Sequence, residues 1–238
     1  MKLTILSDVH LEFMQNFWSI ISRLRAFHSQ TDLCILAGDI GHYNELIYSD
    51  FLGEIRNIFP HVIVIPGNHE YHPREKMNLI DEKLRNICQK NNCIFLNKSC
   101  VQINNIKFVG STLWTNCGNV CEYTKLGDQM YSNKLLGNLH YDHLRWLTQE
   151  LAKNEKSVVI THHCPSFQLR AAHYPLDERT KFFYSHLDYL IKDPVKLWVC
   201  GHSHHPCQIR INGVPVVMNP VGYVQERGMW SSELIINV

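Results

Sequence analysis

Short apolar runs rich in Ile, Val and Leu recur along the chain and alternate with longer segments of helical periodicity. Runs of this kind are typical of strands that are buried on both faces of a sheet. We predict such strands at residues 3–6, 33–37, 62–65, 94–96, 107–109, 158–160 and 197–200. Amphipathic helices are predicted at residues 17–27, 45–58, 77–90, 139–152 and 184–191. Strands that alternate with helices indicate an α/β fold with a largely parallel sheet.

The C-terminal part follows a different pattern. Residues 208–212, 214–218 and 234–238 are strand-like, with no helix between them. Asn212-Gly213 joins the first two, and this dipeptide favours a tight hairpin, so we expect antiparallel pairing here. Segments 115–138 and 165–183 have no assignment and are expected to be long loops, which are usually functional or disordered. No repeat or linker divides the chain, so we expect one domain over residues 1–238.

Composition excludes several classes of protein. The 238 residues are 45 % hydrophobic and 19 % charged, which is typical of a folded globular chain. A formal net charge of +1 argues against a dedicated nucleic-acid binder. No segment resembles a secretory signal or approaches the ~20 apolar residues that span a bilayer, so we expect a soluble, cytoplasmic protein without a membrane partner. The nine Cys include no C-x-x-C pair and are expected to be reduced, although Cys117 and Cys121 could pair or bind metal.

Side chains of metal-ligand type follow five of the predicted strands. The clusters are Ser7-Asp8-Val9-His10, Gly38-Asp39, Gly67-Asn68-His69-Glu70, Thr161-His162-His163 and Gly201-His202-Ser203-His204-His205. The chain has 15 His, and seven of them lie in these few positions. In open α/β sheets the loops at the carboxyl ends of strands converge on ligands. We therefore expect the five clusters to form one site.

The residue types in these clusters indicate metal chemistry. Asp8 and His10, like His202 and His204, are two positions apart, and in an extended chain such residues point the same way. The glycines that open three of the clusters permit close approach of backbones. Carboxylate, amide and imidazole ligands without thiolate suit Mn, Fe or Zn. The supply exceeds four ligands, which favours two divalent metal ions, and a pair about 3.5–4 Å apart can clamp a phosphoryl group and activate water.

In this order, the five clusters resemble the motifs of the calcineurin-like metallophosphoesterases. The resemblance runs from residue 8 to residue 204, and the set of motifs is specific for that superfamily but not for a substrate. It implies an α/β fold of four layers, αββα, in which two mixed β-sheets are flanked by helices. It also implies a binuclear metal centre at one edge of the sheets, as in small, single-domain bacterial-type members.

The resemblance implies roles for individual residues. The first metal ion would be held by Asp8, His10, Asp39 and His204, and the second by Asp39 as a bridging ligand with Asn68, His162 and His202. His69 would stand beside the phosphate as transition-state stabiliser or proton donor to the leaving group. Of the adjacent pair, we expect His162 to be the ligand because it directly follows the strand, with His163 behind it or in contact with substrate.

The chain also departs from the family's Ser/Thr protein phosphatases. Those enzymes follow Gly-Asp with an acidic residue and an Arg, whereas Asp39 is followed by Ile40-Gly41-His42. This argues against a typical protein phosphatase and leaves the partner that orients His69 unidentified, since His42 stands where the acid would be. Val221 stands where small bacterial-type members often carry Arg, which would remove a possible phosphate contact.

We expect direct hydrolysis of a phosphate ester by a hydroxide that bridges the two metal ions, with His69 assisting the leaving group. A monoester dianion usually calls for Arg or Lys, and the five clusters contain none, so a small-molecule phosphodiester is mildly preferred. Arg170, Arg179 and Lys181 of the 165–183 loop could reverse that preference and favour a phosphomonoesterase acting on a protein or a small molecule. Arg170 and Arg179, with His163, are therefore candidate substrate contacts.

Three aromatic residues could stack on a nucleotide base, although packing is the plainer interpretation: Trp114, Tyr123 and Tyr131. Other classes of function fit less well. A catalytically silent scaffold would have lost ligands or His69, and a nuclease would need a basic groove or an added DNA-binding domain. A Cys164 nucleophile beside His163 would leave the other four clusters without a role in the reaction. The oligomeric state is left open by the sequence.

Overall fold

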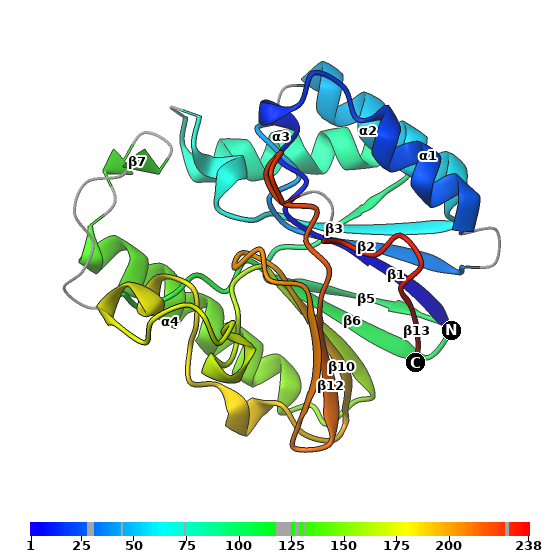
Figure 1. The fold of residues 1–238 in the computed structure, drawn as a ribbon. Helices are drawn as coiled ribbons and strands as arrows, with labels where there is room; N and C mark the ends of the chain where they lie inside the picture. The colour runs from blue at the N-terminus through cyan, green and yellow to red at the C-terminus, as the bar shows by residue number, and fades with distance from the viewer. Residues whose placement is uncertain are drawn as a thin grey trace.

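The computed structural model describes residues 1–27, 31–43, 45–73, 75–117, 125–126, 129–130, 132–226 and 229–238. Within them, two large β-sheets pack face to face, and helices cover the outer face of each sheet (Figure 1). The predicted α/β fold of four layers, αββα, with two mixed sheets is therefore confirmed.

The first sheet has the strand order β13-β1-β2-β3-β4. Its strands are β1 (Lys2–Leu6), β2 (Leu33–Ala37), β3 (His61–Ile65), β4 (Ile94–Phe95) and β13 (Ile235–Asn237). Strands β1 to β4 are parallel, whereas β13 pairs antiparallel with β1. The outer face is covered by α1 (Trp18–Phe27), α2 (Glu45–Ile58) and α3 (Met77–Lys90).

The second sheet has the order β11-β12-β10-β9-β6-β5. Its strands are β5 (Ser99–Ile103), β6 (Ile106–Ser111), β9 (Ser157–Thr161), β10 (Val195–Cys200), β11 (Cys207–Ile211) and β12 (Val214–Met218). The four central strands are parallel, and the edge strands β5 and β11 are antiparallel to their neighbours. Helix α4 (Asn133–Leu151) lies on the outer face, and β7 (Lys125–Leu126) and β8 (Gln129–Met130) form a small separate ribbon.

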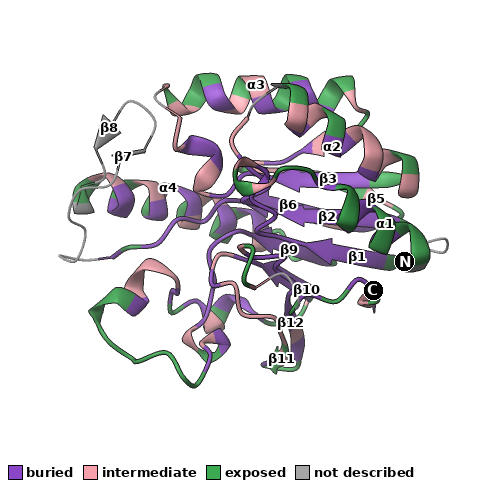
Figure 2. Ribbon diagram, turned by 45° about the horizontal axis from the view of Figure 1, so that its top comes forward, coloured by how far each residue is buried: buried purple, intermediate pink, exposed green. Residues whose placement is uncertain are grey.

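Alternate residues of the central strands enter different cores, which explains why these strands are apolar throughout. Leu3 and Ile5 of β1 pack between the two sheets, whereas Leu6 faces the helices. In β9, Val158 packs between the sheets and Val159 faces the outer layer. Figure 2 shows the central strands as a buried zone, with exposed residues on the outer helices and in the loops. Burial on both faces gives no period of two, because neither face meets water.

The C-terminal strands complete both sheets. The hairpin at Asn212-Gly213 is confirmed, since β11 and β12 pair antiparallel and both turn residues have positive φ (49° and 82°). After β12 the chain crosses to the first sheet, where Ser7 forms a bridge with Pro220. The carboxyl end of β1 therefore lies beside the segment that leaves the second sheet.

One predicted helix is wrong. Residues 184–191 form no α-helix; Tyr184 instead makes a bridge with Cys164, and only the short 3₁₀ helix η5 (Asp188–Leu190) follows. Tyr184, Leu187 and Leu190 are buried at spacings of three, which imitates helical periodicity in a non-helical segment. Helix α4 begins at Asn133, before the predicted 139, and the Ser132 hydroxyl accepts a hydrogen bond from the Leu135 N–H at its start (3.1 Å).

The structure bears on two expectations from the composition, one about membrane-spanning segments and one about the cysteines. No helix among the described residues is long and apolar enough to cross a membrane. Cys34, Cys88, Cys93, Cys164 and Cys200 are buried free thiols. Cys121 lies outside the described residues, and so does the alternative that Cys117 and Cys121 pair or bind metal.

Candidate metal centre

The five clusters meet at the carboxyl ends of the strands. The Asp8 N–H donates to the Gly38 carbonyl (3.0 Å), which joins the loops after β1 and β2. The Gly201 N–H donates to the His162 carbonyl (2.9 Å), which joins the loops after β9 and β10. The sheets face each other, so the loops of both contribute to one site.

Asp8, His10 and His204 form the first group of potential ligands. One ligand atom of each lies within 4.8 Å of the others, and Nε2 of His10 is 3.0 Å from Nε2 of His204. The Nδ1 atoms face carboxylates: that of His10 is 3.2 Å from Oε1 of Glu12, and that of His204 is 2.8 Å from Oε2 of Glu226. A carboxylate only accepts hydrogen bonds, so each Nδ1 carries a proton, and the Nε2 atoms are the nitrogens left to face one another. A cation between them satisfies both.

Asp39, His162 and His202 form the second group. The Nδ1–H of His162 donates to the Ala37 carbonyl (3.0 Å), and its Nε2 lies 3.3 Å from Oδ2 of Asp39 and 3.1 Å from Oδ1 of Asn68. Burial lowers the pKa of His162, but the Asp39 carboxylate outweighs it and raises that pKa to about 10, so a proton occupies the place of a cation. Nε2–H of His202 donates to the Phe182 carbonyl (3.2 Å), which leaves its Nδ1 as the potential ligand.

Members of both groups line one cavity of about 260 Å³: His204 from the first and Asp39 and His202 from the second, together with Asn68. In both groups the second nitrogen of each imidazole is held by an oxygen acceptor, an arrangement that fixes the tautomer of metal-binding histidines. The donor set therefore fits divalent metal ions with oxygen and imidazole ligands. His163 is outside both groups; its Nδ1–H donates to the Thr112 carbonyl (3.2 Å).

The backbone at these ligands is not extended, so the reason for expecting each pair to point the same way is wrong. Asp8, His10, Asp39, His202 and His204 all have φ between 52° and 70°. Residues other than glycine rarely adopt this left-handed region, and such strain concentrates at functional sites. The paired ligands converge because the chain turns sharply at each one.

Glycine permits the close approach of these turns. A Cβ atom at Gly67 would lie 2.1 Å from Oδ1 of Asp39, and one at Gly201 would lie 2.7 Å from Oδ2 of Asp8. Both side chains would have to leave the site to make room. The glycines that precede Asn68 and His202 in the sequence are therefore required by the packing of the ligands themselves.

Glu12, which was not predicted from the sequence, is the partner that orients the ring of His69. Oε1 of Glu12 lies 2.8 Å from Nδ1 of His69, while the ring of His42 is 6.5 Å from that of His69. Burial raises the pKa of Glu12, but the hydrogen bonds from His10 and His69 outweigh it and lower that pKa to about 2. The His69 N–H donates to Oδ1 of Asp39 (2.8 Å). Because a 3₁₀ turn begins at Leu11, the spacing of two between His10 and Glu12 gave no signal in the sequence.

Glu70 ties the loops after β2 and β3 together. Its buried carboxylate accepts the N–H groups of Gly67 (2.7 Å), Ile40 (2.8 Å), Asp39 (3.1 Å) and Gly41 (3.4 Å). Burial and the nearby Asp39 charge raise the pKa of Glu70 to about 7. The side chain lies beneath the ligands and fixes the backbone that carries Asp39 and Asn68.

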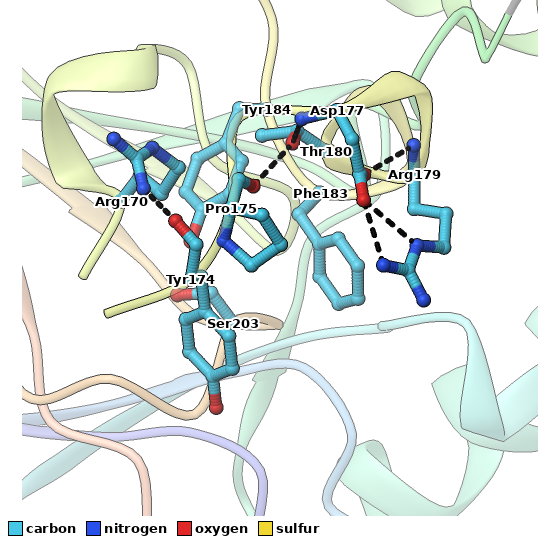
Figure 3. A pocket seen from close by; sticks show the side chains of 9 residues that line it. All are labelled: Arg170, Tyr174, Pro175, Asp177, Arg179, Thr180, Phe183, Tyr184 and Ser203. Atoms are coloured by element: carbon cyan, nitrogen blue, oxygen red, sulfur yellow. Dashed lines mark hydrogen bonds and ion pairs between the residues drawn. The ribbon is translucent and has the colours of Figure 1, made fainter. Parts of the chain in front are cut away.

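Two further cavities adjoin the metal cavity. One, of about 420 Å³, shares Asn68, Phe183 and His202 with it and is also lined by Trp114 and His163. The other, of about 340 Å³, shares Tyr174, Phe183 and Ser203 (Figure 3). Trp114 is 1 % exposed, and its ring lies 5.6 Å from that of Tyr71.

The basic residues predicted to contact substrate are bound within their own loop. Arg170 donates to the carbonyl oxygens of Ala171 and Tyr174. Arg179 is paired with Asp177, as Figure 3 shows, with an Nη2–Oδ2 distance of 2.7 Å, and its side chain is 75 % exposed.

Of the four other residues that the sequence singled out, the structure describes two. Lys181 pairs with Glu178. Tyr123 and Tyr131 lie outside the described residues. Val221 is fully buried in the core beneath α1–α3, so its side chain does not face the cavity.

Two comparisons find similar proteins that align with nearly the whole chain. An uncharacterized protein of Acanthamoeba polyphaga mimivirus is 27 % identical over 99 % of this chain and 96 % of its own length. The phosphopantetheinyl hydrolase PptH of Mycobacterium tuberculosis has a similar fold, with a TM-score of 0.74, 19 % identity and coverage of 100 % of this chain and 95 % of that chain. The protein TT1561 of Thermus thermophilus is more distant, with a TM-score of 0.59, 12 % identity and coverage of 93 % and 89 %.

A family model, calcineurin-like phosphoesterase, matches residues 1–206. The matched region contains all five clusters, and the residues beyond it add β11 to β13 to the two sheets. The chain belongs to the calcineurin-like phosphoesterase family and is a metal-dependent phosphoester hydrolase.

Proposed function

We propose that the chain hydrolyses phosphodiesters of small organic molecules at a binuclear metal centre. The proposed ligands are Asp8, His10, Asp39 and His204 for the first ion and Asp39, Asn68, His162 and His202 for the second. When bound, such ions activate water as the nucleophile and neutralise charge on the phosphoryl oxygens. The observation that carries the proposal is the set of imidazole nitrogens and carboxylate oxygens that face one another at the edge of a single cavity.

His69 is the proposed proton donor to the leaving group. It lines the same cavity, its backbone N–H is bound to Asp39, and its Nδ1 is bound to Glu12, so its Nε2 is the nitrogen available to substrate. Glu12 also lies beside His10, so one carboxylate orients a proposed ligand and the proposed acid together. A fixed ring lowers the cost of reaching the geometry for proton transfer.

The lining of the cavity supports a diester substrate. Among the described residues that form its wall there is no Arg or Lys. A phosphodiester carries one negative charge at neutral pH and a monoester close to two, so the monoester needs more positive charge in the site. The two adjoining cavities provide room for the two organic groups of a diester.

Phosphomonoester hydrolysis is the second candidate, and Arg179 is the observation that favours it. Arg179 lines the cavity that also borders Asn68 and His202, and its exposed pair with Asp177 contributes little that would hold it in place. A guanidinium released from Asp177 could then bind the second charge of a monoester.

Metal reconstitution tests both parts of the proposal. Chelator-stripped protein is assayed with and without Mn²⁺ on bis(p-nitrophenyl) phosphate and p-nitrophenyl phosphate. We expect no turnover without metal, recovery with Mn²⁺, and a higher kcat/KM for the diester. Turnover that survives stripping contradicts the metal centre. A higher kcat/KM for the monoester that falls in Arg179→Ala supports the second candidate instead.

A further inference from the structure

A third group of histidines lies beside the proposed metal centre. His42 follows β2, and His69 and His72 bracket the 3₁₀ turn after β3. One ring nitrogen of each lies within 4.8 Å of the other two. The ring centroids of His69 and His72 are 4.2 Å apart, and His42 lies 6.1 Å from His72 and 6.5 Å from His69.

The free ring nitrogens of this group suit a cation. Nδ1 of His69 is held by Glu12, which leaves Nε2, and this nitrogen lies 3.9 Å from Oδ2 of Asp39. Within the described part of the chain, no side chain or carbonyl is hydrogen-bonded to the ring of His42 or His72. Three imidazoles with an open fourth position are a common zinc set, with ligand nitrogens about 3.3 Å apart. The ring nitrogens lie within 4.8 Å of one another, and small rotations of the half-buried rings of His42 and His72 would bring them to the shorter distance of a zinc set.

We propose that His42, His69 and His72 bind a zinc ion that inhibits the enzyme. Glu12 would then complete a carboxylate–histidine–metal arrangement through His69, which orients the ring and increases its basicity as a ligand. Zinc on Nε2 of His69 occupies the nitrogen that the proposed mechanism uses for proton donation. The inhibition therefore rests on the proposed function, whereas zinc binding at these three rings does not.

The zinc content of the protein tests the site without an activity assay. Metal-stripped protein is dialysed against buffered free Zn²⁺ and the bound zinc is measured by atomic absorption. We expect His42→Ala to bind one zinc per chain fewer than wild type. His61→Ala is the matched control, because His61 is exposed at the amino end of β3, opposite the site, and this variant should keep the wild-type content. His42→Gln serves if the alanine variant does not fold.

Kinetics test the inhibition. Excess Zn²⁺ should inhibit wild type and His61→Ala alike, and the half-inhibitory concentration should rise at least tenfold in His42→Ala, with activity at low zinc within about twofold of wild type. Equal zinc content in wild type and His42→Ala overturns the site. One zinc fewer with unchanged inhibition overturns the inhibitory role. A protein that hydrolyses no ester refutes the proposed function, and the zinc content alone then decides for or against the site.

Discussion

Oε1 of Glu12 lies 2.8 Å from Nδ1 of His69 and 3.2 Å from Nδ1 of His10. A single carboxylate oxygen thus faces a proposed metal ligand and the proposed proton donor. Its charge is retained at neutral pH, because those two hydrogen bonds lower the pKa of Glu12 to about 2 against the effect of burial. Glu12 couples the orientation of the two rings.

Glu12→Gln should lower kcat by roughly 10- to 100-fold, the usual effect of changing a group that orients a metal-binding residue. The amide keeps the shape of the side chain but loses the charge, and its oxygen can accept from one ring while its nitrogen faces the other. Steady-state kinetics with Mn²⁺ on bis(p-nitrophenyl) phosphate measure the loss. His42→Ala distinguishes the orienting partners: if it impairs kcat at low zinc as strongly as Glu12→Gln does, Glu12 is not the partner that matters.

Asp39→Asn should reduce turnover by at least about 1000-fold, or about 4 kcal/mol of activation free energy. Oδ1 can still accept the His69 N–H, and asparagine tolerates the φ of 52° at this position, so the fold should persist. The neutral amide of asparagine is a poorer ligand than the Asp39 carboxylate, which the proposal assigns to both ions, because it carries no negative charge to attract them. Far-UV circular dichroism checks the fold, and Asp50→Asn on the exposed face of α2 is the control. Near-normal turnover of a folded Asp39→Asn variant contradicts the ligand assignment.

The ligand clusters could be recognised from the sequence because of a general property of parallel sheets. Strands buried on both faces are visible as apolar runs, and their carboxyl ends share one edge, so polar residues after each run meet. The positions of Asp8, Asp39 and His202 follow from that rule. The four layers came from the resemblance to a known family rather than from the pattern of residues.

Glu12 and Glu226 could not be predicted in the same way. Glu12 reaches His69 because His10 adopts the left-handed region and a 3₁₀ turn begins at Leu11, and no pattern in the sequence indicates either feature. Glu226 reaches His204 from a turn that follows the last strand of the second sheet. Partners that come from irregular backbone depend on tertiary packing. The wrong helix at 184–191 has the related cause that buried turns can imitate helical spacing.

Glu70→Gln should lower the free energy of unfolding by about 2–4 kcal/mol, because one amide oxygen replaces two carboxylate oxygens that accept four backbone N–H groups. The amide nitrogen would also face those donors. Urea denaturation of the metal-stripped protein measures the change, and Glu82→Gln on the exposed face of α3 is the matched control. Equal stability of both variants contradicts the role of Glu70 as the link between the two loops.

His143 should make the protein sensitive to mild acid. Its Nδ1 accepts hydrogen bonds from the Leu113 N–H (3.3 Å) and the Ser111 hydroxyl (2.7 Å), and burial lowers its pKa to about 3. The unfolded chain binds a proton at this residue near pH 6.5, whereas the folded chain does not until about pH 3. Protonation therefore favours the unfolded chain, and stability falls as the pH drops below about 6.5. The contribution reaches about 2 kcal/mol at pH 5.

In His143→Asn, the amide oxygen can replace Nδ1 as the acceptor and does not titrate. The variant should lose stability at pH 7 through its smaller side chain, but the gap to wild type should narrow by about 2 kcal/mol at pH 5. Urea unfolding at pH 7 and pH 5 measures this difference. The contributions of the other histidines to the pH dependence of stability cancel, because both proteins contain them. His61→Asn, at an exposed position, should parallel wild type. Parallel pH dependence of His143→Asn and wild type would mean that His143 accepts its proton in the folded chain as readily as in the unfolded one.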